Sequence, residues 1–270
     1  MQRLSRLEIL LLSTCASLLA LAVFGPPITQ PGQYHAFADQ RALLGIPFAM
    51  DVLSNLPFAA AGIAGAWCLW RAPAGAISNV QRAMSALFFA GLLMTALGSS
   101  WYHLRPDDAG LAVDRCTMAV AFAGLLGLAA ADRVSERAGA LLGMAVLVLA
   151  PFAVWAWSAT GNLLPWVVVQ SGGMALVLAL SCLRPRIAAI DIRWGAVILA
   201  YGAAKLFELG DHEIYEATGA LVSGHTLKHI AAAAAGWPVI SALGALRFSR
   251  QNHTARSNTK EIAIRRVRGA

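Results

Sequence analysis

Long apolar runs follow one another along nearly all of this 270-residue chain. A helix needs about 20 apolar residues to cross ~30 Å of hydrocarbon. Eight runs of about this length lie near residues 7–24, 52–70, 83–101, 112–131, 138–157, 164–183, 194–209 and 230–248. The runs do not alternate with polar positions as the strands of a β-barrel would, and helices satisfy their own backbone polar groups in lipid. The sequence therefore predicts an all-α, polytopic membrane helix bundle with a seven-span core and one N-terminal span.

The pattern divides the chain into three parts: an N-terminal membrane anchor with an external linker (1–32), a seven-helix membrane domain (33–248) and a basic cytoplasmic tail (249–270). The first run also resembles a cleavable signal peptide, because a basic start precedes it and Ala20-Leu21-Ala22 near its end fits a cleavage site. Its ~18 residues are long for a signal core, so we favour retention. Cleavage would leave seven spans in the same orientation.

Composition supports the membrane assignment. The chain is 58% hydrophobic and 13% charged, whereas soluble domains carry about a quarter charged residues. The four cysteines all fall within predicted spans and form no CxxC motif, so we interpret them as packing residues.

The net charge of +7 follows the topology and does not indicate nucleic-acid binding. Of the 21 Lys and Arg residues, nine lie before the first span or in alternate connections and seven between Arg247 and the C-terminus. If these segments are cytoplasmic, the chain obeys the positive-inside rule. Both termini are then cytoplasmic, and the tail lies beside anionic lipid head groups.

Two i,i+4 pairs that contain histidine lie at the expected external ends of spans. Ser99 and His103 are four residues apart at the end of the 83–101 span, and His225 and His229 are four apart where the last helix enters the membrane. Residues at i and i+4 share one helix face. Asp114 lies at the outer start of the neighbouring span. Ionisable groups at membrane depth are costly and usually functional.

Two histidines at this spacing can bind one metal ion, and a third from another helix gives the three-ligand arrangement of catalytic zinc. A single His-x3-His pair is a weak signal that also fits a structural role or a haem-binding electron carrier, which a visible absorption spectrum would reveal. Two pairs and an aspartate on one membrane face favour a functional site.

These residues resemble a known family. Ser99-x3-His103, Asp114 and His225-x3-His229, together with Ser54-Asn55, resemble the alkaline ceramidases and the wider superfamily of seven-helix membrane hydrolases, which includes the adiponectin-type receptors. The likeness covers roughly residues 33–248.

The resemblance implies a zinc ion bound by His103, His225 and His229, with Asp114 and Ser99 as catalytic residues beside the activated water. The implied substrate is a membrane lipid of the ceramide class, and the site faces the external or periplasmic side. Ceramidases with a calcium site carry several acidic residues around the start of the first core helix, where this chain has only Asp39 and Asp51; calcium is therefore doubtful.

The remaining charged residues within spans favour a structural role. Lys205, Glu208 and Asp211 are three residues apart and are expected to form a ladder of ion pairs. Lys228 is expected to point away from the face of its neighbouring histidines and to extend to the interface.

The sequence thus predicts a zinc-dependent membrane amidohydrolase. The alternative is a receptor or sensor of the adiponectin-receptor type with a mainly structural zinc. Neither the acyl chain and base, nor the choice between amide and ester, nor the oligomeric state follows from the sequence.

Overall fold

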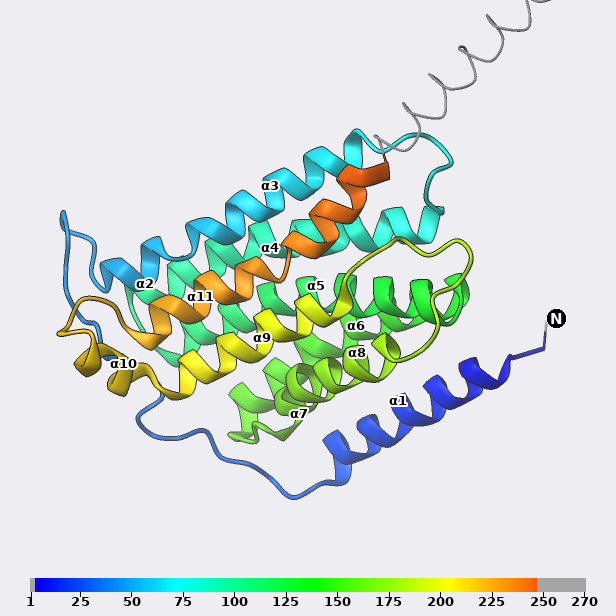
Figure 1. The fold of residues 1–270 in the computed structure, drawn as a ribbon. Helices are drawn as coiled ribbons and strands as arrows, with labels where there is room; N and C mark the ends of the chain where they lie inside the picture. The colour runs from blue at the N-terminus through cyan, green and yellow to red at the C-terminus, as the bar shows by residue number, and fades with distance from the viewer. Residues whose placement is uncertain (1–2, 247–270) are drawn as a thin grey trace, which may run out of the picture.

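The computed structural model describes residues 3–246 and is all-helical, with only two isolated β-bridges in that part of the chain. The helices lie roughly parallel or antiparallel in one elongated bundle (Figure 1). Their bounds are α1 (Arg6–Phe24), α2 (Ala49–Leu53), α3 (Leu56–Trp70), α4 (Asn79–Leu104), α5 (Asp108–Arg133), α6 (Glu136–Thr160), α7 (Leu164–Val167), a π-helical turn η1 (Val168–Gly172), α8 (Gly173–Ser181), α9 (Trp194–Leu209), α10 (Asp211–Ala217) and α11 (Gly224–Ala234).

The predicted polytopic bundle is confirmed. Among the described residues, seven helical segments are long and apolar enough to cross a membrane: α1, α2 with α3, α4, α5, α6, α7 through α8, and the segment Gly224–Leu246 that begins with α11. The 16-residue α9 packs lengthwise against α11 and completes a seven-helix core beside the N-terminal helix. The four cysteines are free, as expected.

Polar caps set where the long helices begin. Ser78 opens α4 with a capping box to Gln81, and the side chains of Asp107 and Ser223 accept backbone N–H bonds at the starts of α5 and α11. Such caps satisfy N–H groups that have no partner within the helix. Helices α4 and α11 therefore start several residues before their apolar runs.

Helix α5 is the centre of the bundle, while α1 is peripheral. In its most apolar window, 61% of α5 is buried inside the protein, compared with 11% of α1. Glycines allow α4 and α5 to approach closely: Gly91 faces the backbone of Ala121, and Gly124 faces the backbone of Phe88. Small residues at such contacts are the usual means of close helix packing in membranes.

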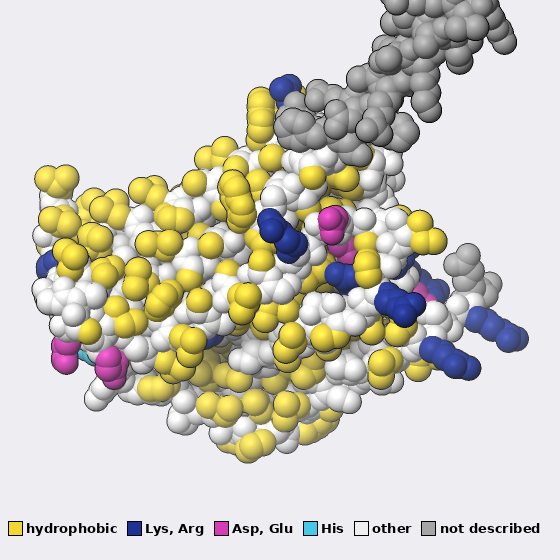
Figure 2. Space-filling view, viewed as in Figure 1, with side chains coloured by type: hydrophobic (Ala, Val, Ile, Leu, Met, Phe, Trp, Pro, Cys, Tyr) yellow, Lys and Arg dark blue, Asp and Glu magenta, His cyan; other side chains and the backbone are white. Residues whose placement is uncertain are grey.

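Charges gather at the ends of the bundle and leave the middle apolar. Figure 2 shows that most of the Lys and Arg side chains on the visible face lie toward the end with the N-terminus and the α8–α9 connection. At this end Glu8 of α1 accepts hydrogen bonds from Ser135 and Arg137, at 2.6 Å and 2.8 Å. The α10 helix and the start of α11 lie at the opposite end (Figure 1).

Candidate metal centre

Three buried histidines from two helices meet at the α10 end of the bundle. His103 lies in the last turn of α4, and His225 and His229 lie one turn apart on α11. Their side chains are nearly inaccessible, with exposed fractions of 1%, 6% and 3%. One ring nitrogen from each lies within 4.8 Å of the other two. The convergence expected from the two i,i+4 pairs is present, and the group could bind a metal ion.

One of the three nitrogen separations fits tetrahedral coordination. Nε2 of His103 and Nε2 of His225 are 3.3 Å apart. Two nitrogen ligands at about 2.05 Å from a tetrahedral metal ion are about 3.3 Å apart. The axial ligands of a haem lie on opposite faces of the porphyrin, and a 3.3 Å separation leaves no room for that ring. Imidazole donors suit zinc, copper, iron and nickel, so the ligand set alone does not choose among them.

A serine from the α2–α3 junction orients His229. Ser54 Oγ donates to the carbonyl of Asp51 at 3.0 Å and lies 2.7 Å from Nδ1 of His229. A hydroxyl has one proton to donate, so Ser54 accepts a hydrogen bond from Nδ1–H of His229. The lone pair of that ring is then on Nε2. Partners of this kind fix the tautomer and direction of metal-binding histidines.

Two aspartates position the start of α11. Asp211 Oδ1 accepts the backbone N–H of His225 at 2.7 Å, while its Oδ2 accepts that of Ala38 at 3.0 Å. Asp51, which is fully buried, accepts a hydrogen bond from Thr226 Oγ1 at 3.0 Å. The expected ladder of Lys205, Glu208 and Asp211 was therefore wrong at its third member. Sequence spacing gave no sign of these contacts, because they join segments far apart in the chain.

The loop before α2 covers the histidines at the α10 end of the bundle. The ring of Phe37 packs against His103 and His225, at centroid distances of 4.8 Å and 4.4 Å, and is itself 4% exposed. His35 anchors the loop through Nδ1 to Tyr102 Oη at 2.8 Å and Nε2 to Asp108 at 3.1 Å. The α10 end of the site is thus closed by aromatic side chains.

Asp39, one of the two acidic residues around the start of the first core helix, pairs with an arginine. Asp39 forms a bidentate pair with Arg41, with contacts of 2.8 Å and 2.6 Å. Burial tends to raise the pKa of the Asp39 carboxyl, but the bonds from Arg41 hold that pKa below its ordinary value. The arginine also donates to the carbonyl of Leu221, so this pair joins the loop before α2 to the segment before α11.

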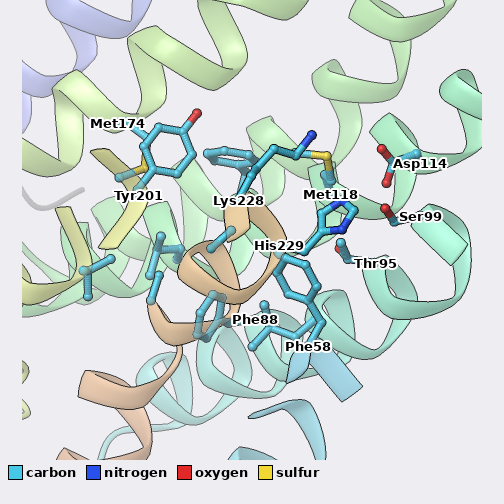
Figure 3. A pocket seen from close by; sticks show the side chains of 17 residues that line it. Phe58, Phe88, Thr95, Ser99, Asp114, Met118, Met174, Tyr201, Lys228 and His229 are labelled. Carbon is cyan, nitrogen blue, oxygen red and sulfur yellow. The ribbon is translucent and has the colours of Figure 1, made fainter. Parts of the chain in front are cut away.

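A cavity of about 110 Å³ extends from His229 into the middle of the bundle. Ser99, Asp114 and His229 line one end, while Phe58, Phe88, Leu92 and Phe122 are among the apolar side chains along the rest. Figure 3 shows the Ser99 hydroxyl and the Asp114 carboxylate next to each other, with His229 facing them. Asp114 Oδ1 is buried without a hydrogen-bond partner. The structure therefore brings the expected catalytic residues to one cavity; their roles stay a prediction.

Lys228 corrects a second expectation. It does not extend away to the interface: its Nζ lies 2.9 Å from Glu208 Oε1, and the side chain lines the cavity beside His229 (Figure 3). Glu208 also pairs with Lys205 at 2.5 Å, as the i,i+3 spacing suggested. The expectation failed because Glu208, on the neighbouring helix α9, lies within hydrogen-bonding distance of Lys228.

Comparison with known proteins adds no relative to this picture. No family model, no curated protein and no solved structure matches the chain.

Proposed function

We propose that this protein is a zinc-dependent integral membrane hydrolase that cleaves the amide bond of ceramide-like lipids to a sphingoid base and a fatty acid. The observation that carries the proposal is the buried three-histidine group beside Asp114 and Ser99 at the end of an apolar cavity. The 3.3 Å nitrogen separation fits a tetrahedral zinc site. Three protein ligands leave a fourth position free for chemistry.

Each residue has a role that suits its surroundings. Zinc, when bound, supplies the Lewis acidity that activates water and polarises a carbonyl at neutral pH. The partnerless Oδ1 of Asp114 can accept a proton from the attacking water and deliver it to the amine that leaves. Ser99, 2% exposed, can donate a hydrogen bond to the carbonyl oxygen as negative charge develops there. The net reaction adds one water across the C–N bond.

The surroundings of the site suit a substrate that stays in the membrane. Phe37 covers the histidines on the outside, whereas apolar side chains line the cavity on the side toward the bundle centre. A lipid tail can occupy the apolar part while the amide reaches His229 and Asp114. The distribution of Lys and Arg supports cytoplasmic termini and a site toward the external or periplasmic face.

The test is lipid hydrolysis by the purified protein in detergent, with metal content measured on the same sample. We expect one zinc per chain and release of free fatty acid from ceramide in micelles. Asp114→Asn should keep its zinc and lose most turnover, because an amide cannot carry the proton. Ser99→Ala should lose less, since one hydrogen-bond donor contributes about 10²–10³ in rate.

The outcomes separate the proposal from its rival. A fully metallated protein that releases nothing from any ceramide or related lipid amide would favour the receptor or sensor function. Full activity in Asp114→Asn would keep the hydrolase and overturn the role given to Asp114.

A further inference from the structure

A group of three charged side chains borders the cavity at membrane depth. Glu208 of α9 binds two lysines, Lys205 through Oε2 at 2.5 Å and Lys228 of α11 through Oε1 at 2.9 Å. Only Lys228 lines the cavity. Charged residues inside membrane proteins are rare and tend to mark substrate sites. A lysine in the cavity wall therefore indicates a functional role in addition to packing.

The group carries more positive than negative charge. Each carboxylate oxygen of Glu208 is occupied by one lysine, which leaves one positive charge uncompensated. Asp114 borders the same cavity, so the two lysines and two carboxylates sum to zero charge, but among the described residues no ion pair joins Asp114 to either lysine. The positive charge of Lys228 at the cavity wall is therefore available to an anionic group.

Hydrogen-bond donors without partners point to the same ligand chemistry. The ammonium group of Lys228 has three donors, and the structure gives it one partner, Glu208. The hydroxyl of Tyr201 is buried without a partner and belongs to a side chain that lines the cavity (Figure 3). Thr95 offers nothing more, because its hydroxyl donates to the carbonyl of Gly91. Two free donors beside an apolar cavity suit the oxygens of a lipid carboxylate.

We propose that Lys228 and Tyr201 bind a carboxylate on the amine portion of the substrate, so that the preferred substrates are long-chain N-acyl amino acids. This inference rests on the proposed amidase function. Lys228 and His229 line the same small cavity, so a carboxylate at Lys228 suits a substrate that carries it close to the amide, as an N-acylglycine does. Hydrolysis breaks the C–N bond, forms a C–O bond from water, transfers a proton to the amine and yields a fatty acid and the amino acid.

The experiment compares N-palmitoylglycine with N-palmitoylethanolamine, which has the same acyl chain and no charge. We expect kcat/KM of the wild type to be higher for the glycine amide, and this preference to fall about tenfold or more in Lys228→Met, since hydrogen bonds to charged groups are the stronger ones. Lys205→Met is the matched control. It removes the same charge from the group of three and leaves Lys228 in the cavity, so the preference should persist.

Other results would overturn the inference. A wild type that prefers the ethanolamide, or equal losses of preference in Lys228→Met and Lys205→Met, would exclude contact between Lys228 and the substrate. If Lys228→Met does not yield folded protein, Tyr201→Phe serves instead: it removes one hydroxyl, and an unchanged preference would count against the subsite.

A binding measurement separates failure of the subsite from failure of the hydrolase. If neither amide is cleaved, the melting temperature in detergent is measured with each lipid. Greater stabilisation by N-palmitoylglycine that disappears in Lys228→Met would support the subsite in a protein that is no hydrolase. Equal stabilisation by the two lipids would overturn the subsite as well.

Discussion

The direction of one imidazole depends on a serine from another helix. Ser54 donates its only proton to the carbonyl of Asp51 and therefore accepts from Nδ1 of His229. This bond turns Nε2 of His229 toward the other two histidines. Ser54 thus determines which nitrogen of His229 is available to a metal ion, although Ser54 is not itself a ligand.

Removing that hydroxyl should weaken metal binding without abolishing it. We expect Ser54→Ala to lower zinc affinity by about tenfold to a hundredfold, the usual cost of losing a partner of a metal-binding histidine. Competition with a chelator of known affinity measures the change. Ser100→Ala is the control, because its hydroxyl lies nearby but donates to the carbonyl of Val52 at 3.3 Å. Equal losses in the two variants would mean that Ser54 does not orient the ligand.

The histidines themselves should have a much larger effect. Alanine at His103, His225 or His229 should remove most of the bound zinc, because two protein ligands rarely hold it well. Metal analysis after gel filtration checks this. His35→Ala and His212→Ala should keep the metal: His35 binds Tyr102 and Asp108, and His212 binds the carbonyl of Ala36. Loss of metal in either control, with retention in His103→Ala, would refute the ligand assignment.

Sequence reasoning reached the histidines because their spacing is local. An i,i+4 pair shares a helix face whatever surrounds it, and topology placed His103 at the same end of the bundle. It missed Phe37 and Asp211, whose contacts with His225 depend on how the loop before α2 and α10 fold back over α11. It also misplaced Lys228, because its partner Glu208 is on a different helix.

At the scale of helices, hydropathy identified the segments that cross the membrane, but it was less accurate about the residues at which the helices begin. The apolar run 230–248 omits the first turns of α11, which starts at Gly224 after the cap of Ser223. Likewise α4 starts at Asn79, before its run at 83–101. Hydropathy measures contact with lipid, whereas caps and histidines at helix ends are polar. The turn η1, between α7 and α8, has no hydropathy signal at all.

Close packing of α4 and α5 gives a prediction at this scale. A Cβ at Gly124 would collide with the backbone of Phe88, which cannot move aside as a flexible side chain could. We expect Gly124→Val to destabilise the bundle by about 1–3 kcal/mol and to lower Tm by roughly 2–10 °C. The control is Gly202→Val on α9, where nothing lies within 4 Å of the added atom. Thermal unfolding in detergent compares the two; an unaffected Gly124→Val would contradict the packing.

At the scale of the whole molecule, the two ends of the bundle have different chemistry. One end holds the histidines, the loop before α2 and α10, and the other holds the Glu8–Arg137 pair and the α8–α9 connection. The C-terminal segment from Arg247 on, which carries seven of the basic residues, lies outside the described residues, so its place in this arrangement stays a prediction. If the protein is the proposed hydrolase, orientation decides which leaflet supplies the substrate.

The orientation can be tested with single cysteines at opposite ends of the bundle. In a variant with the four native cysteines changed to alanine, Arg105→Cys lies in the exposed connection between α4 and α5, near the histidines. Ala74→Cys lies in the exposed connection between α3 and α4, at the other end. A membrane-impermeant maleimide added to intact cells should label the first and reach the second only after lysis, because the positive-inside rule places Arg71 and Arg82 in the cytoplasm. The reverse pattern would place the histidines at the cytoplasmic face and favour the receptor-like orientation. Labelling of both cysteines from outside would contradict a bundle that spans the membrane between positions 74 and 105.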